Sequence, residues 1–130
     1  MAIEANNPPK TMPRQNQPTF LFVCKDGLDA PRLRAEHLDG HLRHVETNWE
    51  NYVTAGPLKA PGSPTIHGSA LIVKADTLAA AWDILNGDPY FTSGLFTTVE
   101  VHDMTMSIGT YVGGKIWESA DAVRHKANGG

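Results

Sequence analysis

The chain has 130 residues, which is enough to bury one hydrophobic core but not two, so we expect a single domain. Its formal net charge of −3 removes any general electrostatic reason to bind nucleic acid or an anionic membrane, and no apolar run approaches membrane-spanning length. Cys24 is the one cysteine, which excludes an intramolecular disulfide, and the N-terminus lacks the apolar core of a signal peptide, so a cytoplasmic protein is expected.

Hydrophobic spacing predicts alternating strands and helices after a short arm. Residues 1–18 are rich in proline, asparagine and glutamine, which predicts a flexible N-terminal arm. The pattern then predicts six elements: a strand over 20–24, a helix from Asp29 to about Thr47 or Asn48, a strand over 52–55 that Gly56-Pro57 ends, a strand over 67–74, a helix from Asp76 or Thr77 to about Asn86, and a strand over 95–101. The loop over 58–65 is expected to be a lid or a connector.

The βαββαβ order predicts an α+β fold, in which a four-stranded antiparallel sheet carries both helices on one face. The other face would stay open, and the strand over 20–24 is apolar on both sides, so that face needs a cover. A second copy of the chain would supply it, and we therefore expect a homodimer. Residues 104–130 form a C-terminal extension whose apolar side chains predict a further strand, or a segment packed on the domain or on the partner subunit.

The first predicted helix combines an apolar stripe with ionisable side chains. The stripe is expected to face a core and consists of Leu38, Leu42, Val45 and Trp49. His37, His41 and His44 line one edge of it, and Arg34 points along it. A cation and an imidazole are thus directed at the rim of the interior.

Metal binding and thiol chemistry are the two readings that the sequence disfavours. His37 and His41 have the i, i+4 spacing that can bind zinc, with His44 or His67 as a third ligand, but there is no HExxH motif, second pair or cysteine cluster, so no metal site is expected. Cys24 lies inside an apolar strand, where a thiol is usually inert.

An ordered set of short motifs resembles the YCII-related family. The set covers roughly residues 19–103 and comprises Arg34-Ala35-Glu36-His37-Leu38, Thr54-Ala55-Gly56-Pro57, Gly68-Ser69, Trp82, Asp88-Pro89-Tyr90, Gly94 and Val99-Glu100-Val101. The resemblance implies a ferredoxin-like, dimeric α+β barrel related in fold to muconolactone isomerases. It also implies a pocket between the first helix and the sheet that holds a histidine and an aspartate, here His37 and Asp88. Characterised relatives include a dehydrochlorinase of aromatic degradation.

His37 and Asp88 are the candidate catalytic residues. An imidazole can act as acid or base near neutral pH, and a carboxylate can fix its tautomer, which suits proton abstraction beside a carbonyl. The alternative for His37 is a helix histidine bonded to a backbone carbonyl. The alternative for Asp88 is a residue that only initiates a turn before Pro89.

Four further residues are candidates for substrate binding. Arg34 could clamp a substrate carboxylate, or lie along the surface with its head in water. Gly56 would allow close backbone approach and Ser69 could orient a polar group, yet both are ordinary strand-end residues. Tyr90 could be a pocket wall or proton donor, or simply pack in the core.

Two functions follow from these residues and from the resemblance. The first is a cofactor-independent lyase or isomerase that acts on a cyclic or aromatic-derived metabolite through the His/Asp pair. The second is a non-catalytic module, of small-molecule-binding or stress-associated type, that holds a ligand in the same pocket. A structural or regulatory role is a third alternative, which a pocket filled by side chains would favour.

Overall fold

Strand β1, Thr19–Asp26, is an inner strand of the sheet and pairs antiparallel with β3 on one side and β4 on the other. The strand order is β2-β3-β1-β4, all antiparallel, with β2 and β4 at the edges. The computed structural model describes residues 9–13 and 16–127. The remaining elements of the sheet unit are α1 (Ala30–Glu36), α2 (Leu38–Asn48), η1 (Trp49–Asn51), β2 (Tyr52–Lys59), β3 (Ile66–Lys74), α3 (Leu78–Leu85), α4 (Pro89–Thr92) and β4 (Phe96–Asp103).

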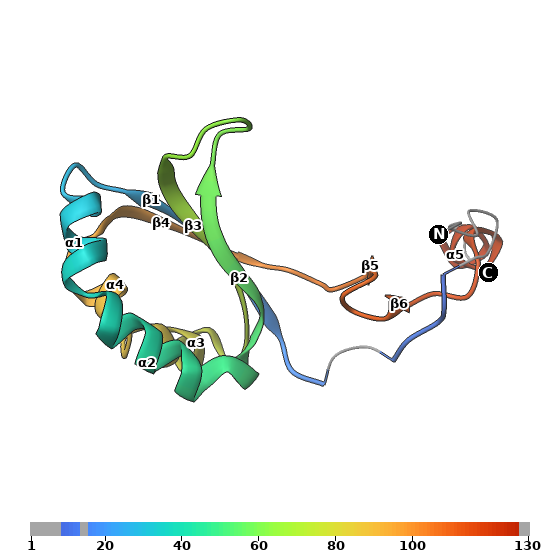
Figure 1. Ribbon diagram of the computed structural model, residues 1–130. Helices are drawn as coiled ribbons and strands as arrows, with labels where there is room; N and C mark the ends of the chain where they lie inside the picture. Colours follow the sequence, from blue (N-terminus) through green and yellow to red (C-terminus); the bar gives the residue numbers. More distant parts are fainter. Residues whose placement is uncertain (1–8, 14–15, 128–130) are drawn as a thin grey trace. The chain divides into compact units, whose positions relative to one another are not determined.

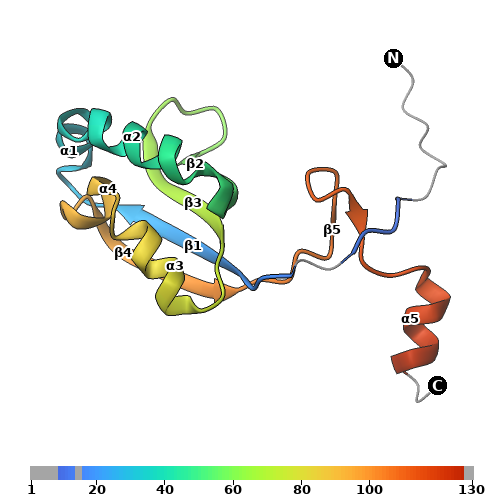
Figure 2. The same cartoon turned by 90° about the horizontal axis from the view of Figure 1, so that it is seen from below.

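The helices α1 to α4 all lie on one face of this sheet (Figures 1 and 2). The order of elements and of strands is that of a ferredoxin-like α+β fold, as the sequence predicts. The main core lies between the sheet and α3, where Phe22, Val73 and Leu85 are fully buried. Trp82 packs edge-on against Phe22, with ring centroids 5.1 Å apart. This tight layer fixes α3 on the sheet, while α2 lies farther from the core and none of its residues is buried.

Three local predictions are wrong. The single helix expected over 29–48 is two helices, because the backbone of His37 leaves helical geometry (φ −103°, ψ 11°) between α1 and α2. The turn expected after Asp88 contains the short helix α4. Gly56-Pro57 does not end β2, because this strand lies at the edge of the sheet, where a proline needs no partner on its outer side.

Of the two residues expected to begin the second predicted helix, Thr77 is the cap of α3, and its hydroxyl accepts from the Ala80 amide.

The chain divides into two units, one of residues 17–104 and one of residues 1–16 with 105–130. The second unit contains β5 (Ile108–Gly109), β6 (Gly114–Lys115) and α5 (Ala120–Ala127). Its N-terminal part pairs with β6: the Lys115 amide donates to the Lys10 carbonyl and the Met12 amide donates to the Lys115 carbonyl, each at 2.8 Å. The Lys115 ammonium is buried and donates to the Trp117 and Glu118 carbonyls. Within the described ranges, no helix has the length and apolarity needed to cross a bilayer.

Candidate functional site

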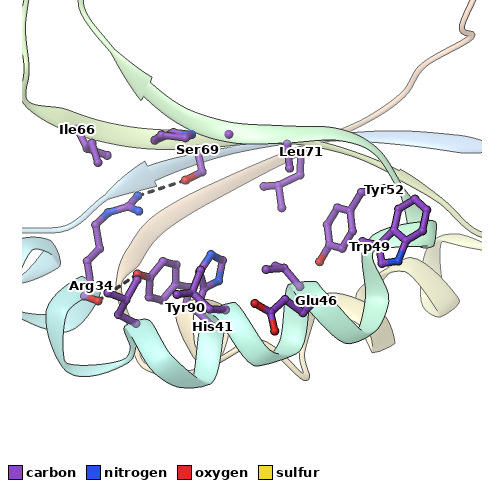
Figure 3. Close-up of a pocket in the computed structure, with 15 residues that line it drawn as sticks. Arg34, His41, Glu46, Trp49, Tyr52, Ile66, Ser69, Leu71 and Tyr90 are labelled. Carbon is purple, nitrogen blue, oxygen red and sulfur yellow. Dashed lines mark hydrogen bonds between the residues drawn. The ribbon is translucent and has the colours of Figure 1, made fainter. Parts of the chain in front are cut away.

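A cavity of about 700 Å³ lies between α2 and the helix-covered side of β2 and β3 (Figure 3). The apolar stripe of α2 faces this cavity and not a core, which corrects the expectation from the sequence. Leu38, Leu42 and Trp49 are consequently 48%, 44% and 66% exposed. Leu71 of β3 forms part of the opposite wall. An apolar surface left open in this way is typical of a ligand pocket.

His41, and not His37, is the imidazole beside Asp88. Its Nδ1 lies 2.8 Å from Oδ2 and 3.0 Å from Oδ1 of Asp88, and the Asp88 side chain is only 1% exposed. An ionised carboxylate can only accept, so Nδ1–H donates, and in the neutral imidazole Nε2 then carries the lone pair. His41 belongs to the cavity wall and its side chain is 24% exposed. The geometry thus provides an oriented base at the edge of the cavity.

The predicted pairing of His37 with Asp88 is wrong, because the turn after α3 approaches α2 one helical turn beyond His37. A Cβ added to Gly40 would lie 3.1 Å from Pro89, and a Cβ added to Gly87 would lie 2.8 Å from the His44 ring. These two glycines let the turn reach the segment of α2 that holds His41. A glycine inside a predicted helix is a signal for such a close approach. His37 is half-buried at the junction of α1 and α2 and is not part of the cavity wall.

Tyr90 holds the His41 ring in place. The two rings stack with centroids 3.8 Å apart and planes 4° apart. The Tyr90 hydroxyl donates to the Arg34 carbonyl at 3.0 Å, and its amide donates to Asp88 at 2.9 Å, which caps α4. The pKa of the Tyr90 hydroxyl is raised, mainly by burial; Arg34 opposes this shift and Asp88 adds to it. Tyr90 is therefore a wall and a positioning residue, with its own proton already engaged.

Arg34 adopts neither arrangement expected from the sequence, because its guanidinium is paired inside the protein. Nε and Nη2 donate to the two carboxylate oxygens of Asp26 at 3.0 and 2.9 Å, and both side chains are largely buried. Nη2 also lies 3.2 Å from the Ser69 hydroxyl oxygen. Ser69 therefore accepts from Arg34 and keeps its own proton available. Figure 3 shows this Arg34–Ser69 contact across one end of the cavity.

Gly56 also lines the cavity, but the space around it is open. A Cβ added there would meet no atom within 4 Å, so packing does not require a glycine at this position. The close backbone approach occurs at Gly68 instead, where a Cβ would lie 2.3 Å from the Cys24 carbonyl of β1.

Tyr52 is a cavity residue that the sequence did not single out. Figure 3 shows its ring at the end of the cavity away from Arg34. Its hydroxyl is buried and has no hydrogen-bond partner among the described residues. Burial, with a further contribution from Asp88, raises the pKa of Tyr52 to about 12, so this phenol stays neutral. An aromatic residue at the start of a strand carries no sequence signal that separates this position from ordinary packing.

Neither a cluster of metal ligands nor a reactive thiol adds to this site. Over residues 9–13 and 16–127, no three His, Cys, Asp or Glu side chains come together in a way that could hold a metal ion. Cys24 is 1% exposed. Burial, with a further contribution from Asp26, raises the pKa of its thiol to about 12, although Arg34 lowers it. A thiol in this environment stays protonated at neutral pH.

The sequence matches the family model of the YCII-related domain over residues 19–105. No curated protein matches the chain significantly. One solved structure of similar fold is the 5-chloro-2-hydroxyhydroquinone dehydrochlorinase of Burkholderia phenoliruptrix AC1100, in complex with 2,5-dihydroxybenzoquinone. The two proteins are 25% identical, the TM-score is 0.61, and the match covers 72% of this chain and 97% of the dehydrochlorinase chain. The family match spans more than half of the chain, and the strand order agrees with it: the protein belongs to the YCII-related domain family.

Proposed function

We propose that the protein is a lyase that removes a proton and a leaving group from a cyclic, aromatic-derived small molecule, with His41 as the base and Asp88 as the group that orients it. The observation that carries this proposal is the bond from His41 Nδ1 to the buried Asp88 carboxylate at 2.8 Å, at the wall of a largely apolar cavity. The dehydrochlorinase of similar structure, which acts on a hydroquinone, supports the same class of reaction.

In the proposed step, Nε2 of His41 takes a proton from the bound molecule. The electron pair of the broken bond forms a new double bond, and the leaving group departs with its own bonding pair. The positive charge that develops on the imidazole is balanced by Asp88. The step is neutral in redox terms and needs no cofactor. If the proton returned to another carbon and no group departed, the same residues would catalyse an isomerisation.

The test is turnover of a panel of chlorinated hydroquinones that includes 5-chloro-2-hydroxyhydroquinone, followed by chloride release and by mass spectrometry of the product. His41→Ala should lower turnover by about 10²–10⁴-fold, the usual contribution of a general base. His37→Ala is the matched control and should retain most of the activity, because His37 is not part of the cavity wall. Full activity in His41→Ala, or an equal loss in His37→Ala, would remove the proposed role of His41.

A non-catalytic binding function is the second candidate, and the open apolar face of α2 supports it equally well. The same panel separates the two functions. A ligand that binds and is returned chemically unchanged by the wild-type protein would favour the binding module.

We also infer that two copies associate through the sheet face opposite the helices, and that the protein is located in the cytoplasm. This face has an apolar centre, where Leu21 pairs with Ile72 and Val23 pairs with Ala70, and all four residues are only half-buried in one chain. A second copy would bury them. The contribution of the C-terminal extension to this contact stays a prediction. The cytoplasmic location is supported by the single, reduced cysteine.

A further inference from the structure

The charged groups of the cavity wall are already balanced or negative. Arg34 is neutralised by Asp26, and His41 is bonded to the Asp88 carboxylate. Glu46 adds a further negative charge on α2. With His41 neutral, these groups carry a net negative charge, and a ligand carboxylate in the cavity would meet no cation without a partner. The cavity therefore disfavours anions as ligands.

The Arg34 end of the cavity nevertheless offers hydrogen-bond donors. Arg34 uses Nε and Nη2 in the hydrogen bonds between described residues, whereas Nη1 takes part in none of them. Ser69 accepts from Nη2 and so has its own O–H to donate. Two donors from opposite walls, α1 and β3, thus line one end of a cavity whose remaining lining is largely apolar. Such a pair suits an oxygen atom that accepts hydrogen bonds and carries no full charge.

We propose that Asp26 determines the substrate class. Asp26 occupies the fork of Arg34, which is the pair of donors Nε and Nη2 that would otherwise bind a ligand carboxylate. This end of the cavity is therefore a site for an uncharged oxygen acceptor, a carbonyl or a phenol, and it excludes carboxylates. This inference rests on the proposed function and restricts the substrates to neutral phenolic or quinone-like rings. Rings that carry a carboxylate are excluded. The raised pKa of Tyr52 agrees with it, since burial first, and Asp88 in addition, disfavour an anionic phenol in this wall.

A pair of nearly isosteric probes tests the proposal by calorimetry at pH 7.5. 4-Hydroxyacetophenone carries a neutral carbonyl where 4-hydroxybenzoate carries a carboxylate. The wild-type protein should bind the ketone at least about ten-fold more tightly, which is the scale expected for one unfavourable charge in a partly buried site. Equal affinity for the two probes, tighter binding of the carboxylate, or no binding of the ketone at millimolar concentration would overturn the proposal.

Asp26→Asn should shift the affinity ratio toward 4-hydroxybenzoate by about ten-fold or more, because the fork of Arg34 becomes available to a carboxylate. Glu46→Gln is the matched control: it also removes one negative charge near the cavity, but leaves Arg34 paired, and should shift the ratio by only about two-fold. Equal shifts in the two variants would show a general charge effect and would overturn the role of Asp26.

Ser69→Ala keeps the proposal testable if Asp26→Asn fails to fold with Arg34 unpaired. This variant should weaken binding of 4-hydroxyacetophenone by about ten-fold and leave binding of ethylbenzene, which has no oxygen to accept a hydrogen bond, unchanged. An equal loss for both ligands, or no loss for either, would contradict the acceptor site. His41→Ala should keep the preference for the ketone, so a failure of the proposed catalysis and a failure of this inference give different results.

Discussion

Asp88 performs two tasks through one buried carboxylate. It accepts the Tyr90 amide, which begins α4, and it accepts Nδ1–H of His41. Of the sequence-based alternatives for this residue, the structure shows a helix cap instead of a simple turn initiator, and the role of Asp88 as an acid of the site stays a prediction. The two tasks can be separated by choosing the substitution, because asparagine caps helices about as well as aspartate but carries no charge.

We expect Asp88→Asn to keep the fold and to lose the orientation of His41. The amide oxygen can still accept from the Tyr90 amide, which leaves the amide NH₂ facing Nδ1 and forces the imidazole proton onto Nε2. Turnover should then fall by about 10²-fold or more. Nitrogen NMR of the His41 ring should show the change of tautomer, a signal that a loss of stability alone would not produce.

Asp88→Ala provides the comparison, since it removes the cap as well and should cost about 1 kcal/mol more in the free energy of unfolding. If Asp88→Asn retained wild-type turnover and the wild-type tautomer, Asp88 would be only a helix cap.

At the scale of elements, the four strands of the sheet and α3 follow from hydrophobic spacing, and the pairing of the strands follows from their order. The break at His37 does not, because hydrophobic spacing carries no signal for a change of backbone geometry at a single residue within a helix-forming stretch. That break, together with the approach of Gly87 to α2, makes His41 the partner of Asp88. The apolar stripe of α2 was readable from sequence, but a stripe that faces a cavity has the same period as one that faces a core.

The pairing of β6 with the N-terminal segment can be tested at Gly114. A Cβ there would lie 1.8 Å from the Lys10 carbonyl, so Gly114→Ala should separate residues 10–12 from β6. Trypsin should then cleave after Lys10 faster than in the wild-type protein.

Gly113→Ala is the control for this test, because Gly113 also has a positive φ (88°) but has open space around it. Backbone strain is present in both variants, and only Gly114→Ala adds the clash. Equal cleavage rates in the two variants would mean that the pairing of β6 with Lys10 does not protect the segment.

At the scale of the whole molecule, the two faces of the sheet differ in what they contact. One face carries the helices, the core and the cavity, and the other carries the apolar centre formed by β1 and β3. A strand such as β1, with apolar side chains on both sides, is typical of a sheet that is covered twice. Hydrophobic spacing in one chain predicts that the second face is covered but does not identify the cover, which we propose to be a second copy.

Ile72→Lys tests whether that cover is a second copy. Ile72 lies opposite Leu21 on the helix-free face, so a lysine there would place a charge at the centre of the proposed contact. Burying an unpaired charge is costly enough to favour the separated chains strongly, while the side chain stays solvated in the monomer. Light scattering coupled to size exclusion should therefore give twice the chain mass for the wild-type protein and the mass of one chain for the variant. Thr65→Lys, in the exposed loop before β3, adds the same charge away from this face and should leave the mass unchanged. A wild-type protein with the mass of one chain would remove the proposed contact. An Ile72→Lys variant that kept the double mass would place the contact elsewhere. In both cases the apolar centre of the sheet would need another cover.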